Sequence, residues 1–333
     1  MAVSMSSSSS VLSIRDLRVT FKTHQGSVQA VRGVDLDISG GELMGVVGES
    51  GSGKSVTFLA AMGLLPSSAK ISGSVCLDGE ELIGASAKKM RSVRGRLLSM
   101  IFQDPLSALN PVHRVGEQIV EMLHSHQKLS AKAAAVRAVE LLDLVGIPQP
   151  TERAAQYPHE FSGGMRQRVV IAMAIANNPK VLIADEPTTA LDVTVQAQIL
   201  EVLQRVQEKF GTAIVLITHD LGVIARVASR ANVMYAGRNV ESGSVDSLFD
   251  HPSHPYTRGL LNSLAHEGSA RLEPIAGFPP NMLRPPSGCG FSPRCQFSQS
   301  NCDESIPELR SFADVQTACI RAEDLVVNRG DAR

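Results

Sequence analysis

The octapeptide GESGSGKS, Gly48 to Ser55, constrains the fold of this chain more than any other stretch. It follows a short apolar segment, 42–47, and precedes a segment with helical spacing that ends at Pro66. Glycines allow backbone N–H groups to wrap around a phosphate, and the start of a helix adds a partial positive charge. The stretch therefore predicts a strand, a phosphate-binding loop and a helix in succession.

Two side chains at the end of this loop suit a nucleoside triphosphate. Lys54 can reach the β- and γ-phosphates, and the hydroxyl of Ser55 can hold Mg²⁺. The alternative is an ordinary Gly- and Ser-rich turn, which the combination of strand, helix and lysine disfavours. The predicted nucleotide-binding residues of the loop are Gly48, Glu49, Ser50, Gly51, Ser52, Gly53, Lys54 and Ser55.

Polar residues also follow two later apolar segments. VLIADEP ends in Asp185 and Glu186, and LITHD contains His219. At the carboxyl edge of a sheet, Asp185 suits a contact with Mg²⁺, and Glu186 suits polarising the water that attacks the γ-phosphate. His219 could bond both that water and the phosphate. Taken singly, the carboxylates could be a solvated strand end, and a lone histidine is more often structural.

The pattern along the chain indicates the fold class. Segment 11–38 and the hairpin that bends at Asp78-Gly79 predict antiparallel strands. Leu97–Gln103 predicts a buried strand, and 111–146 has helical spacing. Strands and helices then alternate, which implies a mostly parallel sheet. We predict an α/β fold around the phosphate loop, with an antiparallel β subdomain and a helical subdomain.

Composition shifts mark the expected domain boundaries. The opening MAVSMSSSSS has low complexity and lacks the apolar region of a signal peptide, so we expect disorder over 1–10. After about residue 250 the chain is rich in Pro, Gly, Ser and His. We therefore expect a main domain at 11–250 and a C-terminal extension at 251–333.

The composition disfavours two classes of protein. A net charge of −1, the absence of Trp and an aromatic fraction of 4% argue against a nucleic-acid partner. The longest apolar run, Val169–Ala176, is far shorter than the span of about 20 residues that a transmembrane helix needs. We expect a cytoplasmic location, where thiols stay reduced and disulfides are disfavoured.

A second Gly-rich turn, FSGGM at 161–165, opens another helix. Five residues alone could be a helix cap. However, the order of phosphate loop, Gln103, FSGGM, Asp185-Glu186, ALD and His219 resembles the ATP-binding subunit of an ABC transporter. The resemblance covers roughly 12–248, and Phe161 and Met165 depart from the more usual Leu and Gln.

The resemblance implies that each ATP lies between two chains. Ser162, Gly163 and Gly164 of this signature loop would contact the nucleotide held by the opposite subunit. Asp192, in the D-loop, would cross the dimer interface. ATP would then close a head-to-tail pair of cassettes, and hydrolysis would open it.

The resemblance also implies the remaining site residues. Phe21 would stack on adenine, where a tyrosine is more usual, and Gln103 would sense both Mg²⁺ and the membrane partner. The helical subdomain, about 104–165, would grip that partner. The implied catalytic residues are Glu186, His219 and Gln103, and the implied Mg²⁺ contacts are Ser55, Gln103 and Asp185.

The segment HPSHPYTRGLL, 251–261, resembles the start of the extension in the oligopeptide, dipeptide and nickel importer branch. Its two histidines are interpreted as turn residues. This resemblance implies a peripheral subunit on the cytoplasmic face of the inner membrane that energises import of di- or oligopeptides. Its partners would be a related, non-identical ATPase, two permease subunits and, indirectly, an extracytoplasmic solute-binding protein. The alternatives are a nickel or other-solute importer, and a soluble ABC-type ATPase of DNA repair or translation.

Four of the five cysteines lie in the extension: Cys289, Cys295, Cys302 and Cys319. Four thiolates can hold Zn²⁺ or a [4Fe–4S] cluster, although their spacing fits neither the usual zinc knuckles nor the ferredoxin run. The resemblance to the importer branch favours [4Fe–4S], with zinc and unmetallated thiols as alternatives. A metal centre would staple a tail that has little core of its own. Cys76 is expected to be a small buried side chain in a strand.

Overall fold

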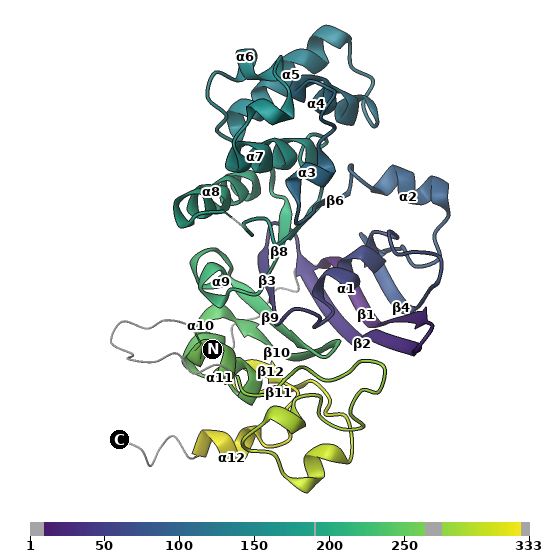
Figure 1. Cartoon of the computed structure of the whole chain (residues 1–333), viewed down its shortest axis with the longest axis vertical. Helices are drawn as coiled ribbons and strands as arrows, with labels where there is room; N and C mark the ends of the chain where they lie inside the picture. The colour runs from purple at the N-terminus through teal and green to yellow at the C-terminus, as the bar shows by residue number, and fades with distance from the viewer. Residues whose placement is uncertain (1–9, 190, 264–274, 328–333) are drawn as a thin grey trace, which may run out of the picture.

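The computed structural model describes residues 10–189, 191–263 and 275–327. These residues form two β-sheets with helices packed around them (Figure 1). Among these residues, the larger sheet has the strand order β11-β12-β10-β9-β3-β8-β7-β6, and the smaller has the order β2-β1-β4-β5. The predicted disordered segment, 1–10, lies outside the described residues except for Ser10, which begins β1.

The centre of the larger sheet is parallel, as the alternation of strands and helices predicts. β9, β3, β8, β7 and β6 pair in parallel, and almost all of their residues are buried because both faces of the sheet are covered. Their bounds are Leu43–Val47 for β3, Leu98–Ile101 for β6, Val181–Asp185 for β7, Ala213–Thr218 for β8 and Arg230–Tyr235 for β9.

The smaller sheet is antiparallel, as predicted, and it consists of β1 (Ser10–Thr23), β2 (Gly26–Ser39), β4 (Ala69–Leu77) and β5 (Glu80–Glu81). The predicted bend at Asp78-Gly79 joins β4 to β5, and both residues have the positive φ that a tight hairpin requires. The prediction that Cys76 is buried was wrong. Its side chain is half-buried, because only the two-residue β5 covers that edge of β4.

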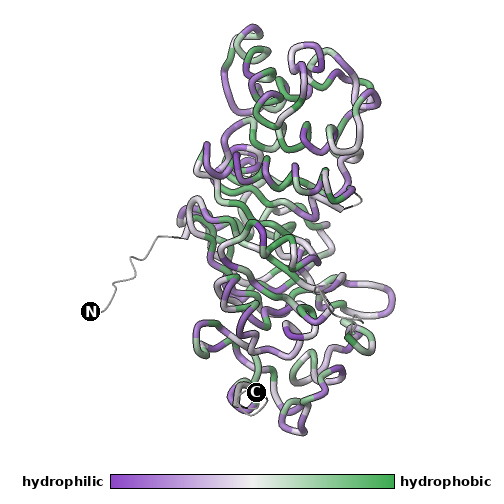
Figure 2. Tube along the Cα trace, turned by 90° about the vertical axis from the view of Figure 1, so that its left-hand side faces the viewer, coloured by the Kyte–Doolittle hydropathy of each residue, from purple (hydrophilic) through white to green (hydrophobic). Residues whose placement is uncertain are grey.

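Two hydrophobic cores lie on opposite faces of the larger sheet. Along β8, Val215 and Ile217 face the core shared with the antiparallel sheet and α1 (Lys54–Ala61). Ile214 and Leu216 face the core shared with the long helices. This alternation is the two-residue period of a strand covered on both sides. Hydrophobic segments accordingly concentrate in the middle of the molecule (Figure 2).

The helical subdomain lies at the end of the molecule opposite the C-terminal extension (Figure 1). The predicted helical spacing over 111–146 is confirmed by α4 and α5, and Ser130 caps α5 by accepting the N–H of Ala133. Within the described ranges, none of the helices is both long enough and apolar enough to cross a bilayer. Between residues 87 and 210 the helices are α2 (Ala87–Val93), α3 (Pro105–Ala108), α4 (Val115–His124), α5 (Ala131–Leu144), α6 (Pro150–Ala154), η1 (Pro158–Glu160), α7 (Gly163–Ala174) and α8 (Val193–Phe210).

The residues after 250 join the main sheet. Strand β12 pairs antiparallel with β10, so the backbone of the extension continues the larger sheet at its β10 edge. His254 caps α11, with Nδ1 accepting the N–H of Tyr256, as expected of a turn residue. The elements are α9 (Leu221–Val227), β10 (Arg238–Ser244), α10 (Val245–Asp250), α11 (Pro255–Asn262), η2 (Ser292–Arg294), η3 (Ser300–Asp303), β11 (Arg310–Phe312), β12 (Val315–Thr317) and α12 (Ala322–Val327).

Candidate nucleotide-binding site

The carboxyl ends of three adjacent parallel strands meet at one edge of the sheet. In β3, Val47 pairs with Thr218 of β8, and in β7, Asp185 pairs with Ile217 of β8. The phosphate loop follows β3, Glu186 follows β7 and His219 follows β8. The strand pairing thus brings together segments that lie far apart in the sequence, at the edge where ligands of open α/β sheets bind.

The phosphate loop is closely packed against its surroundings. A Cβ at Gly48 would lie 2.2 Å from the Met234 carbonyl oxygen, and a Cβ at Gly53 would lie 2.6 Å from that of Ala30. Only glycine fits these two positions. The buried Lys54 donates to the carbonyl oxygens of Gly48 at 2.7 Å and Glu49 at 3.0 Å. Burial lowers the pKa of Lys54, and the nearby carboxylates partly offset this effect.

Of the three predicted Mg²⁺ contacts, Ser55 and Asp185 are bonded to each other, whereas Gln103 donates to Glu186. The Ser55 hydroxyl donates to the Asp185 carboxylate at 2.9 Å. Burial raises the pKa of Asp185, and the hydrogen bond from Ser55 opposes that shift. One carboxylate and one hydroxyl fit Mg²⁺, which usually takes one or two protein oxygens and completes its shell with water and substrate phosphates.

Glu186 lies at the centre of the predicted catalytic residues. Its carboxylate accepts a hydrogen bond from the Gln103 side chain at 3.0 Å and from Thr189 at 2.9 Å, and its other oxygen lies 3.2 Å from Nδ1 of His219. Burial alone would raise the pKa of Glu186, but the bonds from Thr189 and His219 outweigh it and lower that pKa. The backbone of Glu186 has a φ of 47°, a strained conformation that is concentrated at functional sites.

One open pocket contains most of these groups. It is lined by the phosphate loop from Ser50 to Val56 together with Gln103, Glu186, Thr189 and His219. Thr189 was not predicted, although the run DEPTTALD placed it three residues after Glu186. The pocket therefore offers an anion cradle, a lysine, a hydroxyl and an ionised carboxylate, which together suit phosphoryl transfer to water.

The signature loop lies outside this pocket. Ser162 caps α7 by accepting the N–H of Met165, and both Ser162 and Gly163 are exposed. A Cβ at Gly164 would lie 2.4 Å from Cγ1 of Val195, so this glycine lets α7 pack against α8. Asp192 caps α8 and is also exposed.

The structure does not bring Phe21 into the pocket. Phe21 lies on β1 opposite Val28 and Ala69, and it packs half-buried at the margin of the antiparallel core. Residues from the loop that carries the phosphate cradle, and not this ring, form the pocket wall. Its predicted stacking on adenine stays a prediction.

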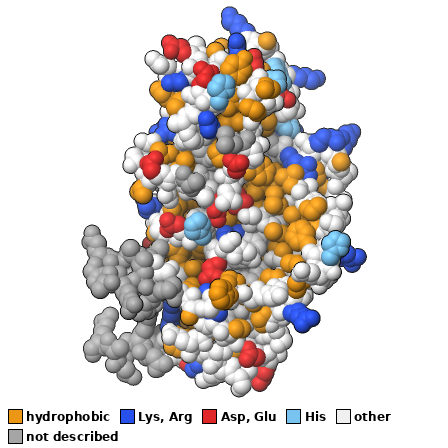
Figure 3. All heavy atoms as spheres, viewed as in Figure 1, with side chains coloured by type: hydrophobic (Ala, Val, Ile, Leu, Met, Phe, Trp, Pro, Cys, Tyr) orange, Lys and Arg blue, Asp and Glu red, His pale blue; other side chains and the backbone are white. Residues whose placement is uncertain are grey.

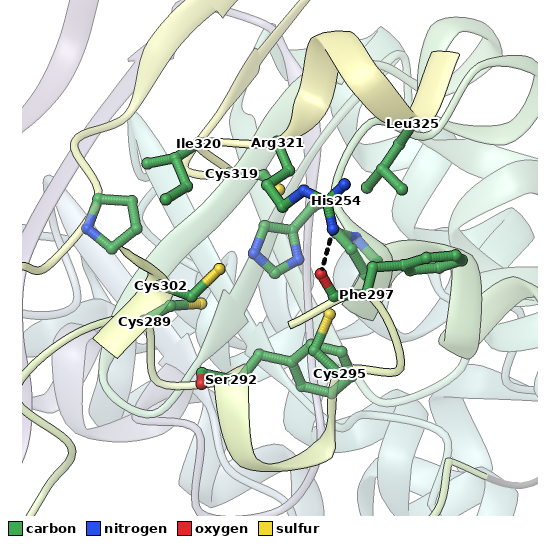
Figure 4. A pocket seen from close by; sticks show the side chains of 13 residues that line it. His254, Cys289, Ser292, Cys295, Phe297, Cys302, Cys319, Ile320, Arg321 and Leu325 are labelled. Atoms are coloured by element: carbon green, nitrogen blue, oxygen red, sulfur yellow. Dashed lines mark hydrogen bonds between the residues drawn. The ribbon is translucent and has the colours of Figure 1, made fainter. Parts of the chain in front are cut away.

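The four cysteines of the extension line a second cavity, together with His254, Phe291 and other residues (Figure 4). Burial and the neighbouring thiols raise the pKa of Cys289 and Cys295, and they raise that of Cys319 to about 11. In the part of the chain that the structure describes, all cysteines are free thiols, and no three metal-binding side chains are close enough to hold one ion.

Comparisons with known proteins agree with this architecture. Residues 31–189 match the family model of the ABC transporter, and 240–302 match that of the oligopeptide/dipeptide transporter C-terminal region. The chain is 53% identical to the oligopeptide transport ATP-binding protein OppD of Bacillus subtilis over 91% of this chain and 86% of that protein. It is 51% identical to the dipeptide transport ATP-binding protein DppD of the same organism over 97% of this chain and 99% of that protein.

A solved structure of a similar fold extends the comparison. A dimeric ATP-binding cassette in a post-hydrolysis state, bound to ADP and phosphate, aligns with a TM-score of 0.63 and 28% identity. The alignment covers 70% of this chain and 98% of that cassette. From its sequence relatives, its family models and its fold, the chain belongs to the ABC transporter ATP-binding proteins, in their oligopeptide/dipeptide branch.

Proposed function

We propose that this chain is the ATP-hydrolysing subunit of an importer of di- or oligopeptides, and that it works with separate permease subunits. The observation that carries the proposal is the ionised Glu186, held by Gln103, Thr189 and His219 in the pocket that also contains the phosphate loop. The lowered pKa keeps this carboxylate ionised at neutral pH, so that it is available to accept a proton from the attacking water.

The roles of the surrounding residues follow from their chemistry. The backbone N–H groups of the loop bind the phosphates of ATP, and Lys54 turns from the loop carbonyls to the γ-phosphate. Mg²⁺, when held by Ser55 and Asp185, would neutralise charge on the phosphates. His219 and Gln103 orient Glu186 and the water. We assign adenine stacking to Phe21 on the resemblance alone.

The exposed signature loop supports a head-to-tail pair of cassettes. Ser162 and Gly163 are exposed and lie outside the pocket of their own chain, so they are available to a nucleotide held by a second subunit. The Asp192 turn is exposed as well and suits the same interface. We infer that the second subunit is a related, non-identical ATPase, and that ATP closes the pair until hydrolysis opens it.

The surface beside Gln103 suits the membrane partners. Phe102, next to Gln103, is 39% exposed, and Val112 is 73% exposed. Hydrophobic side chains also gather on the same side of the molecule as α1 and α2 (Figure 3). We propose that two permease subunits dock here and on the helical subdomain, which would place the chain at the cytoplasmic face of the inner membrane. A solute-binding protein would act only through those permeases.

We also propose that the four cysteines hold a [4Fe–4S] cluster, with Zn²⁺ as the alternative. All four cysteines line one cavity, and four thiolates are a ligand set that either centre can use. Anaerobic purification should give iron and a broad visible absorption band, and Cys295→Ser should lose both. Zinc in place of iron, or thiols without metal, would contradict the cluster.

Reconstitution tests the function directly. In proteoliposomes with its permeases and partner ATPase, the wild-type chain should drive ATP-dependent uptake of a labelled peptide. Glu186→Gln should abolish uptake while ATP still binds, and Lys54→Ala should lose ATP binding. Uptake that persists in Glu186→Gln would overturn the proposal, and uptake of nickel chelates but not peptides would reassign the solute.

A further inference from the structure

Glu49, the second residue of the phosphate loop, is held by two side chains from the C-terminal extension. Arg294 donates from Nη1 to the Glu49 carboxylate at 2.8 Å. The hydroxyl of Tyr256 accepts the backbone N–H of Glu49 at 2.8 Å. These partners are 245 and 207 residues away in the sequence, so the contacts are purely tertiary. The extension thus contacts the loop at both its backbone and its side chain.

Arg294 is anchored within the extension before it reaches the loop. Its side chain is 5% exposed, and it donates to the carbonyl oxygens of Ala276 and Ile275 at 2.8 and 3.1 Å. It also donates to the Tyr235 hydroxyl at 3.2 Å. Because these bonds fix the planar guanidinium, the carboxylate of Glu49 meets a preorganised partner.

An aromatic cluster connects this anchor to the cysteine cavity. The rings of Tyr235, Tyr256 and Phe291 lie 4.5 to 5.4 Å apart between their centroids. Phe291 lines the cavity of the four cysteines, and Arg294 directly precedes Cys295 in the chain. Arg294 ends the short helix η2, which lies between Cys289 and Cys295, so the contact with the phosphate loop comes from the segment that joins two of the cysteines.

We infer that Arg294 is a positioning residue for ATP binding: it holds the phosphate loop through Glu49 and so makes the nucleotide site depend on the folded extension. This inference rests on Gly48–Ser55 being the ATP-binding loop. A loop held in place before ATP arrives loses less conformational freedom on binding, and its N–H groups stay aimed at the phosphates. The effect concerns ATP affinity, because Arg294 bonds to Glu49, Tyr235 and two backbone carbonyl oxygens, and Glu186 is not among its hydrogen-bond partners in the described part of the chain.

Matched variants of the full chain test the inference with a fluorescent ATP analogue. Arg294→Ala and Glu49→Gln should each raise the Kd about tenfold, since the first removes the charge-assisted hydrogen bond and the second removes the carboxylate charge that strengthens it. The double variant should weaken binding no more than either single change. Arg310→Ala is the control, because it removes another arginine–carboxylate pair of the extension, with Glu323, away from the loop. In the assembled transporter, KM for ATP should rise while kcat is retained.

Two further measurements keep the outcomes distinct. Arg294→Ala could disturb the folding of the extension, and thermal unfolding of the variant tests this. Glu49→Gln changes only the loop side of the ion pair, so its effect on ATP binding does not depend on the folding of the extension. Arg294→Lys should restore part of the affinity by keeping the charge. If Lys54→Ala does not impair binding, the assignment of the ATP loop fails. If Lys54→Ala impairs binding but Arg294→Ala and Glu49→Gln behave like Arg310→Ala, or their effects add, the inference about Arg294 fails.

Discussion

The nucleotide pocket and the cysteine cavity are built on different principles. In the pocket, three parallel strands end side by side and their regular pairing sets the positions of the polar groups. In the cavity, the cysteines lie on short 3₁₀ turns and loops, with few regular elements between them. A sheet edge preorganises its site through backbone hydrogen bonds. A cavity between loops depends on side-chain packing and on whatever the cysteines bind.

The two sites also differ in how they treat charge. Hydrogen bonds keep Glu186 ionised despite its partial burial, whereas burial raises the pKa of Cys289, Cys295 and Cys319 and keeps these three thiols protonated in the absence of metal. The pocket is therefore ready for chemistry at neutral pH. The thiols of the cavity are unreactive as nucleophiles until a metal ion displaces their protons.

The largest expected effect is in the pocket. Glu186→Gln removes the general base but keeps the size and hydrogen-bonding reach of the side chain, so ATP hydrolysis should fall about 10²- to 10⁴-fold with ATP binding retained. Phosphate release by the assembled transporter measures the first quantity, and nucleotide binding the second. A loss of less than tenfold would mean that the pocket does not use this carboxylate as its base.

The second effect concerns the junction between the main sheet and the extension. Glu241 of β10 is fully buried, and burial raises its pKa to about 7. The folded chain thus keeps this proton up to about pH 7, whereas the unfolded chain releases it near pH 4.5. Stability should fall as pH rises through this window and then level off, because the folded state binds more protons there.

Glu241→Gln removes that dependence. The free energy of unfolding of the variant should be about 3 kcal/mol higher than that of the wild type at pH 8 and equal to it at pH 4.5. The buried His254, whose pKa burial lowers to about 3, is present in both chains and cancels in the difference. Urea unfolding at several pH values measures the difference in stability between the two chains. A difference that does not change with pH would show that Glu241 is not the titrating group.

Thiol alkylation sharpens the contrast in charge. In the metal-free folded chain, the pKa of Cys319 near 11 should slow its reaction with iodoacetamide about 100-fold relative to the urea-unfolded chain. Peptide mass spectrometry gives the rate at each cysteine, with Cys76, outside the cavity, as an internal reference. Equal rates in folded and unfolded chains would mean that the cavity does not bury this thiol.

The smallest effect separates two neighbouring glycines of the signature loop. Gly164→Ala should destabilise the chain by about 1–3 kcal/mol, because the new Cβ meets the stiff side chain of Val195 at 2.4 Å. Gly163→Ala should leave stability unchanged, since its nearest neighbour would be Leu191 at 3.8 Å, while lowering hydrolysis in the assembled pair. Equal stability of both variants would contradict the packing of α7 on α8.

The sequence predicts the pocket well because its signals are local. A strand, a Gly-rich loop and a helix follow one another within 42–66, and the polar residues at 185, 186 and 219 directly follow apolar strands. Pairing of parallel strands then brings these segments together without further information. Thr189 was missed because a threonine in a turn has no distinct chemistry until its partner is known.

The extension could not be predicted to the same depth. Its strands β11 and β12 have only three residues each, and the contacts of Tyr256 and Arg294 with Glu49 join segments more than 200 residues apart. Neither leaves a periodic pattern in the sequence. The prediction that Cys76 is buried failed for a related reason, because burial of a residue on β4 depends on the length of the neighbouring strand β5.

The pairing of β12 with β10 has a consequence for the solubility of shortened chains. Without residues 251–333, which include β11 and β12, β10 would become the edge strand of the remaining six-stranded sheet and expose its unpaired N–H and C=O groups, and such edges pair with other molecules. In the full chain the edge strand on this side of the sheet is the three-residue β11, which is too short to pair with a strand of another molecule. A truncated cassette should therefore aggregate during expression although its catalytic residues are intact.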